Sequence, residues 1–457
     1  MRRPSFFFLW LTLSTACGGG GPSPPGSGGS PGVGGSQATG GQSAAGGTGS
    51  GGNGSGGIGS GGIAAAGGSV GTSTGGDASG GGPAGTEWLP SWATTMQLTE
   101  PDNNPPPPGL ANNTLRQFVW PTVSGAQIRI QLSNERGDAP VDIAEVHIAQ
   151  AKTESDPYDS LGQIDATTDA AFTFAGAPSV SIPVGETVWS DPLDFPLQEV
   201  TLTAISMLFG ATVPGEVTGH PGARTMSYVA SGDAVSAEAL ANPGTKERWY
   251  FINAIEVMAP PDAFAIALLG DSITDGYGTL NDFSRWSDFL TLALEEDPVL
   301  AGKRAVLNFG MGGNNLTTAT QYQDSGLDRF ARDVLGRDKI KWLIVLEGVN
   351  DITSSVQAGT ITGAYQSIID AAEAAGIEVF VSPLTPMNAQ NSPVRGTMND
   401  WIRASQNYDP GVDFDLVLRD PASPDSTLAA YKNDDLHPSK AGYQAMAESV
   451  DLTLFYP

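Results

Sequence analysis

The chain has 457 residues, with 60 glycines, 33 prolines, one cysteine and three histidines, and its formal net charge at pH 7 is −27. One cysteine excludes an internal disulfide framework and a cysteine-built zinc or iron–sulfur site, and three histidines argue against a multi-histidine metal centre. We therefore expect no metal and no cofactor. A surface this acidic repels phosphate backbones, so the composition also argues against nucleic-acid binding.

Residues 1–17 have the layout of a secretion signal. Two arginines precede an apolar run at 6–13 that is too short to span a bilayer, and small residues follow it. Two kinds of cleavage fit this segment. Ser14 and Ala16 have the spacing that an ordinary signal peptidase requires, whereas Ala16-Cys17 resembles a bacterial lipobox, in which Cys17 is the site of lipid attachment. The segment predicts export, and we favour a lipid-anchored protein of the bacterial cell envelope, at the outer membrane or surface, over a freely secreted one.

Residues 18–86 are rich in glycine, serine, alanine and threonine. Such a segment cannot bury enough apolar surface to fold, so it predicts a disordered linker. Random-coil scaling gives a chain of this length an end-to-end distance of about 45 Å. A linker of this kind would let a folded domain reach away from a membrane surface.

Residues 87–260 show a short alternating pattern. Ile128, Ile130 and Leu132 alternate with the polar residues Arg129 and Gln131. Turn residues separate this segment from further short apolar ones at 143–148, 180–182 and 200–208. Many short strands separated by turns predict an antiparallel β-sandwich domain of the jelly-roll type.

The pattern changes after two prolines at 260–261. Apolar strand-like runs now alternate with amphipathic stretches of helical length. We predict strands at 264–269, 305–309, 342–346, 378–381 and 414–418, and helices at 282–294, 326–335, 362–375, 394–407 and 440–455. Apolar strands interleaved with helices predict an α/β domain at 261–457, with a parallel sheet covered on both faces.

Polar residues follow the predicted strands of this second domain. The first strand is followed by Gly-Asp-Ser at 270–272, the second by Gly-Gly at 312–313 and the third by Asn350; Asp434 and His437 precede the last helix. In open parallel sheets the ligand site lies beyond the carboxyl ends of the strands. A serine, a glycine, an asparagine and an Asp/His pair at that edge supply the parts of an acyl-transfer site.

The chemistry assigns a role to each catalytic residue. Ser272 is the candidate nucleophile, and because a hydroxyl is a weak nucleophile near neutral pH it needs a base within hydrogen-bond reach. His437 is the best candidate base, since His147 lies in the alternating strand pattern of the first domain and His220 is predicted to lie in a loop. Asp434 can accept the proton of the other ring nitrogen and hold the imidazole in place.

The oxyanion of the tetrahedral intermediate needs fixed hydrogen-bond donors. The backbone N–H groups of Ser272 and Gly313 and the side-chain amide of Asn350 are the natural set, each worth about 3 kcal/mol. Three acidic residues nearby, Asp275, Asp282 and Asp288, lack a cluster of partners that would bind a metal, so we interpret them as helix caps and solvated residues.

These segments resemble the four blocks of the SGNH (GDSL-type) hydrolase family: Gly-Asp-Ser-Ile-Thr at 270–274, Asn-Phe-Gly-Met-Gly-Gly-Asn at 308–314, Gly-Val-Asn-Asp at 348–351 and Asp-Asp-Leu-His-Pro at 434–438. The resemblance implies a flavodoxin-like three-layer α/β/α fold and the same roles for Ser272, Gly313, Asn350, Asp434 and His437. Gln-Leu-Ser-Asn-Glu at 131–135 and Ser-Tyr-Val at 227–229 resemble the N-terminal β-module of a bacterial subgroup that includes carbohydrate (acetylxylan) esterases.

The preferred hypothesis is a surface-anchored serine esterase without metal or cofactor, whose substrate is a short acyl group, such as acetyl, on a polysaccharide. It would touch a membrane only through its lipid anchor. A lipase, a lysophospholipase or a broad carboxylesterase stays open as the alternative activity.

A hypothesis of another class is a surface carbohydrate-binding protein, in which Trp88, Trp92, Trp120 and Trp189 stack on sugar rings. The alternative for these tryptophans is that they close the β-domain core and its seam with the second domain, which we favour.

Overall fold

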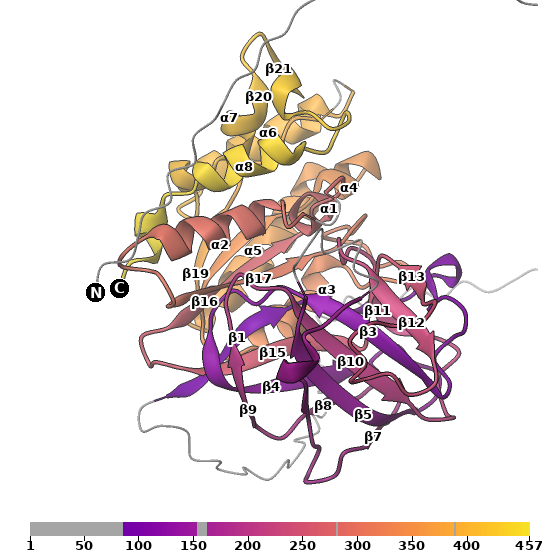
Figure 1. The fold of residues 1–457 in the computed structure, drawn as a ribbon. Coiled ribbons are helices and arrows are strands. Elements are labelled where there is room, and N and C mark those ends of the chain that lie inside the picture. Colours follow the sequence, from indigo (N-terminus) through magenta and orange to yellow (C-terminus); the bar gives the residue numbers. More distant parts are fainter. Residues whose placement is uncertain (1–85, 153–161, 280–281, 388–389) are drawn as a thin grey trace, which may run out of the picture. The chain divides into compact units, whose positions relative to one another are not determined.

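The computed structural model describes residues 86–152, 162–279, 282–387 and 390–457 (Figure 1). The predicted secretion signal, Cys17 and all but the last residue of the predicted linker lie outside the described residues. The described residues all belong to one compact unit, in which antiparallel sheets at 86–260 (the β-domain) precede a parallel sheet with helices at 261–457 (the α/β-domain).

The β-domain is built from antiparallel sheets, as its alternating sequence predicts. One sheet has the order β1-β15-β4-β8 with β9 beside β4, a second has the order β13-β12-β3-β10-β5-β6 with β7 beside β5, and a short third has the order β14-β11-β2. The strands are β1 (Glu87–Ala93), β2 (Gln97–Leu98), β3 (Asn113–Val119), β4 (Gly125–Ser133), β5 (Val141–Gln150), β6 (Ala170–Ala171), β7 (Val180–Ile182), β8 (Thr187–Trp189), β9 (Leu193–Leu197), β10 (Thr203–Phe209), β11 (Thr218–His220), β12 (Ser227–Ser231), β13 (Gly244–Lys246), β14 (Trp249–Tyr250) and β15 (Ile252–Ala259).

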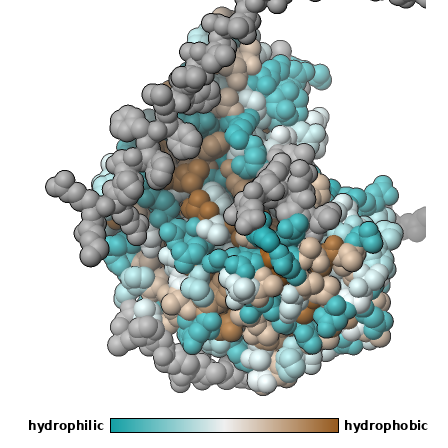
Figure 2. All heavy atoms as spheres, in the orientation of Figure 1, coloured by the Kyte–Doolittle hydropathy of each residue, from teal (hydrophilic) through white to brown (hydrophobic). Residues whose placement is uncertain are grey.

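Strand β4 shows how the alternating sequence produces this arrangement. Ile128, Ile130 and Leu132 are fully buried, whereas Arg129 and Gln131 between them are partly exposed. Successive side chains of a strand point to opposite faces, so one face of β4 enters the core and the other lies nearer the solvent. Figure 2 shows hydrophilic residues over much of the visible surface, with hydrophobic residues in small groups between them.

The α/β-domain contains a parallel sheet of order β17-β16-β18-β19. Its strands are β16 (Phe264–Gly270), β17 (Arg304–Gly310), β18 (Ile340–Leu346) and β19 (Glu378–Val381). In the sheet register Gly270 pairs with Gly310 on one side and with Leu346 on the other. The three central strands therefore end side by side, and the turns that follow them meet at one edge.

Helices cover this sheet. They are α1 (Ser272–Asp275), α2 (Trp286–Glu296), α3 (Gly326–Phe330), which continues as a π-helical turn at Ala331–Leu335, α4 (Val349–Thr353), α5 (Ala358–Ala374), α6 (Ser392–Arg403), α7 (Phe414–Leu418) and α8 (Lys440–Glu448), and a small hairpin pairs β20 (Arg419–Asp420) with β21 (Ser423–Thr427). Helix α2 packs on β17 and on α8, and Figure 1 shows α2 and α8 side by side.

The predicted strand at 414–418 is wrong, because this segment is helix α7. The Asp413 side chain accepts a hydrogen bond from the Leu416 N–H and caps the helix. Phe414 and Leu418 lie four residues apart, so a helix buries both, while Leu416 stays 53% exposed. The predicted final helix is also shorter, since α8 ends at Glu448 and a 3₁₀ turn follows at Leu452–Phe455.

The β-domain covers the β17 edge of the parallel sheet. Strand β1 lies against the edge strand β17 and against β16. The Val306 N–H of β17 donates to Thr122 Oγ1 of the β-domain at 3.1 Å. A side chain thus satisfies a backbone group that an open sheet edge would otherwise leave unpaired.

Candidate active site

Ser272 lies on a tight turn directly after β16. Asp271 precedes it and caps α1, since Asp271 Oδ1 accepts the Ile273 N–H at 3.0 Å. A Cβ at Gly270 would lie 2.3 Å from Thr274 Oγ1 and 2.6 Å from the Leu346 carbonyl oxygen. Only glycine fits between the strand end and the new helix, and this close fit holds Ser272 at the carboxyl edge of the sheet.

The structure brings Ser272 together with Asp434 and His437, two residues of one loop that lies far from Ser272 in the sequence. Ser272 Oγ lies 2.9 Å from His437 Nε2, and His437 Nδ1 lies 2.9 Å from Asp434 Oδ2. A carboxylate only accepts hydrogen bonds, so Nδ1 carries the ring proton and Nε2 is free to accept the serine proton. This is the hydrogen-bond geometry that a nucleophile, its base and the group that orients the base require.

Backbone groups hold Asp434 in its place. Its Oδ1 accepts the N–H groups of Leu436 at 2.8 Å and of His437 at 2.7 Å. Partial burial by itself would raise the pKa of Asp434, but these two N–H groups and the His437 ring outweigh burial and hold the pKa below its ordinary value. Asp434 is therefore ionised throughout the neutral range and can stabilise a protonated His437.

The two further candidate oxyanion donors adjoin the same edge. Gly313 has φ +75°, a left-handed conformation that favours glycine, and no atom lies within 4 Å of where its Cβ would be, so the space beside it is open. Asn350 lies at the start of α4, and its Nδ2 donates to the Asn314 carbonyl oxygen at 2.8 Å. One amide hydrogen fixes the side chain, which leaves the second for a ligand.

Arg329 ties the strand ends together, and the sequence did not reveal this role. Its buried guanidinium donates to the carbonyl oxygens of Gly270 at 2.9 Å and of Phe309 at 2.7 Å. It also donates to Asn314 Oδ1 at 2.8 Å and lies 3.5 Å from Glu347 Oε2. One cation thus joins the ends of β16 and β17 to the loops that carry Gly313 and Asn350.

Two buried carboxyl groups lie behind the nucleophile. Burial raises the pKa of Asp271 to about 8, and the nearby Glu347 and Asp351 carboxylates raise it further. Burial likewise raises the pKa of Glu347 to about 7, against the opposing effect of Arg329. Both groups take up protons at far higher pH than they would in an unfolded chain, so the stability of this site depends on pH.

We expect the free energy of unfolding to fall less from pH 5 to pH 8 in Asp271→Asn than in the unmodified chain. The folded chain keeps a proton on Asp271 up to about pH 8, whereas the unfolded chain releases it near the ordinary pKa of 3.8. The folded state therefore binds more protons across this window, and the free energy of unfolding falls as the pH rises. Asparagine keeps the acceptor for the Ile273 N–H but cannot ionise. Urea unfolding at both pH values measures the difference.

The control for this substitution is Asp262→Asn. Asp262 is exposed, and its hydrogen bond to Lys303 lowers its pKa. It is ionised in both the folded and the unfolded chain above pH 5, so its loss should shift stability equally at the two pH values. If Asp271→Asn and the unmodified chain lost the same stability from pH 5 to pH 8, the buried carboxyl group would not be the cause.

Two expectations for single residues are corrected. His220 is not a loop residue, because it ends strand β11 and is buried. Asp275 is neither a cap nor solvated: its side chain is 2% exposed and contacts His220 and Arg224 of the β-domain. The other two acids agree with the prediction, since Asp288 accepts the N–H at the start of α2 and Asp282 is exposed.

His147 lies where the sequence predicts it. His147 lies in β5 as expected, with Nδ1 2.9 Å from Asp169 Oδ2, and it is far along the chain from the serine site. Within the described ranges, no three histidine, cysteine or acidic side chains gather in a way that could hold a metal ion. Nor does any helix described there have the length and apolar character to cross a membrane.

The parallel sheet and the hydrogen-bonded Ser–His–Asp set give the α/β-domain the arrangement of a serine hydrolase. Residues 268–445 match the model of the GDSL-like lipase/acylhydrolase family. The C-terminal part of the chain therefore belongs to this family of hydrolases that act on ester bonds, and the resemblance of the four sequence blocks is confirmed.

Solved structures of the same family are similar to this part of the chain. An acetyl xylan esterase is 17% identical over 41% of this chain and 97% of its own, with a TM-score of 0.33. A G-D-S-L family protein of Veillonella parvula DSM 2008 is 18% identical over 41% of this chain and 96% of its own, with a TM-score of 0.31. A GDSL-like lipase of Bacteroides thetaiotaomicron VPI-5482 is 16% identical over 40% and 84%, with a TM-score of 0.31. Comparison with curated proteins finds no match.

Proposed function

We propose that the chain is a serine esterase that cleaves short acyl groups, acetyl above all, from polysaccharides through an acyl-serine intermediate. The observation that carries the esterase chemistry is the chain of contacts from Ser272 Oγ to His437 Nε2 and from His437 Nδ1 to Asp434, each 2.9 Å long. It supplies a nucleophile, a base and an orienting carboxylate in the order that acyl transfer needs.

The proposed reaction has two halves. His437 Nε2 takes the hydroxyl proton as Ser272 Oγ attacks the ester carbonyl carbon, and the N–H groups of Ser272, Gly313 and Asn350 bind the resulting oxyanion. When the carbon–oxygen bond to the alcohol breaks, His437 returns the proton to the leaving alcohol. Water then attacks the acyl-serine with the same base, which releases the carboxylic acid and regenerates the serine.

The preference for a polar substrate rests on the surroundings of the site. Among the described residues, the large hydrophobic side chains that are exposed are Val184, Tyr277, Leu292, Val299, Leu416 and Tyr456. Of these, only Tyr277 contacts a catalytic residue in the described structure. The residues exposed beside His437 include the polar Asn433 and Asp435, and Thr318 and Thr320 are exposed on the loop that follows Gly313. A polar rim favours a sugar ester over a long acyl chain, which would need an apolar surface to leave water.

Hydrolysis of p-nitrophenyl acetate, butyrate and palmitate by the chain and by Ser272→Ala tests this proposal. We expect a rate that depends on Ser272 and falls steeply from acetate to palmitate, followed by acetate release from acetylated xylan. A rate that holds or rises with chain length, with fatty acid released from phospholipid, would favour the lipase or lysophospholipase alternative. A rate that falls with chain length but no acetate from xylan would favour a broad carboxylesterase.

The carbohydrate-binding alternative has weak support from the tryptophans. Trp92 is buried edge-to-face against Trp249, and Trp120 stacks on Phe283 of the α/β-domain with ring centroids 5.1 Å apart. Trp88 and Trp189 both pack on the Arg129 guanidinium, at 4.6 and 4.5 Å. Each ring is already engaged within the chain, as expected for residues that close the core and the seam between the domains.

We also propose export and lipid anchoring through Cys17, on the strength of the sequence of residues 1–17 alone. In a bacterial host, Cys17→Ala should move the full chain from the membrane fraction to the soluble fraction. Fractionation followed by detection with an antibody measures the change. An unaltered distribution would leave ordinary signal-peptidase cleavage at Ser14-Thr15-Ala16 as the explanation of the segment.

A further inference from the structure

Asp275 is the point at which the β-domain meets the catalytic turn. It ends helix α1, three residues after Ser272, and its side chain is 2% exposed. Asp275 Oδ1 lies 3.0 Å from His220 Nε2, and Oδ2 accepts a hydrogen bond from Arg224 Nη2 at 2.7 Å. Both partners come from the β-domain, so two of its side chains hold a buried carboxylate on the nucleophile helix.

The fit around Asp275 is close on both sides. A Cβ at Gly222 of the β-domain would lie 1.9 Å from Asp275 Oδ2, and one at Gly310 would lie 2.2 Å from the Asp275 nitrogen. A Cβ at Gly312, next to Gly313, would be 3.4 Å from Asp275 Oδ2. Asp275 therefore lies between the β-domain loop, the end of β17 and the turn that carries the candidate oxyanion donor.

His220 bridges a backbone carbonyl oxygen of the β-domain and the Asp275 carboxylate. His220 Nδ1 lies 2.9 Å from the Thr95 carbonyl oxygen, and Nε2 faces the Asp275 carboxylate. Burial alone would raise the pKa of Asp275, but Arg224, His220 and Arg285 outweigh it and lower the pKa. Asp275 is thus an anion, held by the Arg224 guanidinium and by its contact with His220.

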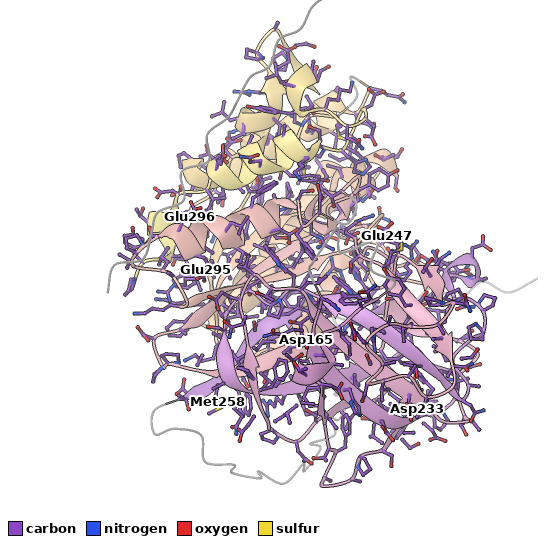
Figure 3. The ribbon with its side chains drawn as sticks, viewed as in Figure 1. Asp165, Asp233, Glu247, Met258, Glu295 and Glu296 are labelled. Carbon is purple, nitrogen blue, oxygen red and sulfur yellow. The ribbon has the colours of Figure 1, made fainter. Side chains whose placement is uncertain are left out.

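Arg224 also reaches the catalytic base through an aromatic ring. Its guanidinium lies 5.7 Å from the centre of the Tyr277 ring, and that ring packs on the His437 imidazole with centroids 4.1 Å apart. Arg224 Nη1 lies 3.6 Å from Glu247, which Figure 3 labels. Arg224 has φ 52°, a left-handed conformation that a residue with a side chain rarely adopts, so its contacts hold an otherwise unfavourable backbone in place.

We propose that His220 and Arg224 are positioning residues of the esterase site, which makes the β-domain part of the catalytic apparatus. Through Asp275 they fix the turn of Ser272 against that of Gly313, and through Tyr277 Arg224 supports the ring of His437. This inference rests on the proposed esterase function. Misplacement of reacting groups by a fraction of an ångström is enough to slow an enzyme, while substrate binding elsewhere is little affected.

The test compares Arg224→Met and Arg224→Lys in the full chain with p-nitrophenyl acetate as substrate. Methionine keeps much of the aliphatic stem but loses the charge and the hydrogen bonds. We expect Arg224→Met to lower kcat by roughly 10- to 100-fold with a change in KM of less than about threefold. Arg224→Lys restores a cation and should recover part of kcat. A folded Arg224→Met protein with unchanged kcat would overturn the inference.

Lys339→Met is the matched control. Lys339 also joins the two domains, since its Nζ lies 2.5 Å from Glu87 Oε2, but it lies at the other end of the sheet, directly before β18. Its loss removes one interdomain ion pair and should leave kcat and KM unchanged. If Lys339→Met lowered kcat as much as Arg224→Met, a general loosening of the domain contact would explain both results and the positioning role would be wrong.

Tyr277 gives a second test that does not disturb the buried ions. Tyr277 is 45% exposed, so Tyr277→Ala leaves the buried ions in place, and it should lower kcat while Tyr277→Phe, which keeps the ring, retains more of it. If Arg224→Met does not fold, these variants and Arg224→Lys decide the matter, and an unchanged kcat in Tyr277→Ala overturns the link to His437. Failure of the esterase proposal is distinguishable, because Ser272→Ala would then be as active as the unmodified chain.

Discussion

Replacing His437 with glutamine should lower kcat for p-nitrophenyl acetate by roughly 10⁴- to 10⁶-fold, with little change in KM. Glutamine is polar and similar in size, but its amide cannot take the proton of Ser272 as the ester bond is attacked. The 2.9 Å contact between Ser272 Oγ and His437 Nε2 would lose its function while the surrounding loop kept its hydrogen bonds to Asp434. Initial-rate measurements over a range of ester concentrations separate kcat from KM.

His147→Gln provides a closely matched control. His147 is 12% exposed against 14% for His437, and its Nδ1 also lies 2.9 Å from an aspartate oxygen, that of Asp169. Ser236 Oγ is nearby, but it approaches the same nitrogen, at 3.3 Å, rather than Nε2. Because the serine and the aspartate both face Nδ1, the hydroxyl of Ser236 has no free ring nitrogen of His147 to which it could give its proton. His147→Gln should therefore retain full activity, and equal losses in both variants would contradict the assignment of the base.

Asn350→Ala should lower kcat by roughly 10²- to 10³-fold, the usual cost of removing one oxyanion donor. The Asn350 amide has one hydrogen bonded to Asn314, and the other is available where charge develops on the ester oxygen. The effect falls on kcat, because the donor acts on the transition state more than on the bound ester. Steady-state kinetics with p-nitrophenyl acetate measure it.

Asn407→Ala is the control for this second substitution. Asn407 is also partly buried in the α/β-domain, and its Nδ2 donates to Glu373 Oε1 at 2.8 Å. It has no hydrogen bond to Ser272, Gly313 or His437, so kcat should stay unchanged. An Asn350→Ala protein with the kcat of the unmodified chain would remove Asn350 from the set of oxyanion donors.

Three of the candidate site residues, Ser272, Gly313 and Asn350, could be placed at one edge of the sheet from the sequence because they follow strand ends. Each central strand is a short apolar run, and parallel strands that end in register bring the residues after them together, as Gly270, Gly310 and Leu346 show. The prediction of a strand at 414–418 was wrong, and the reason is physical. Five residues contain too few turns to distinguish alternation from helical spacing, and the deciding signal is the capping side chain of Asp413.

The contacts between the domains could not be predicted from local pattern. His220 and Arg224 lie more than 50 positions before Asp275 in the chain, and no periodicity relates charges that meet only when two domains pack. Arg329 was missed for the same reason, since its partners are backbone carbonyl oxygens on neighbouring strands. Tyr277 did have a signal: an aromatic residue five positions after the nucleophile lies on the same turn.

The most direct test of the account is to locate the acyl group during turnover. The full chain would be mixed with p-nitrophenyl acetate, quenched in acid within the first turnovers and digested, and the peptides would be analysed by mass spectrometry. We predict an acetyl group on Ser272, a burst of p-nitrophenol that matches the amount of enzyme, and neither in Ser272→Ala. An acetyl group on another residue, or a Ser272→Ala protein that hydrolyses the ester at the normal rate, would contradict the acyl-serine mechanism.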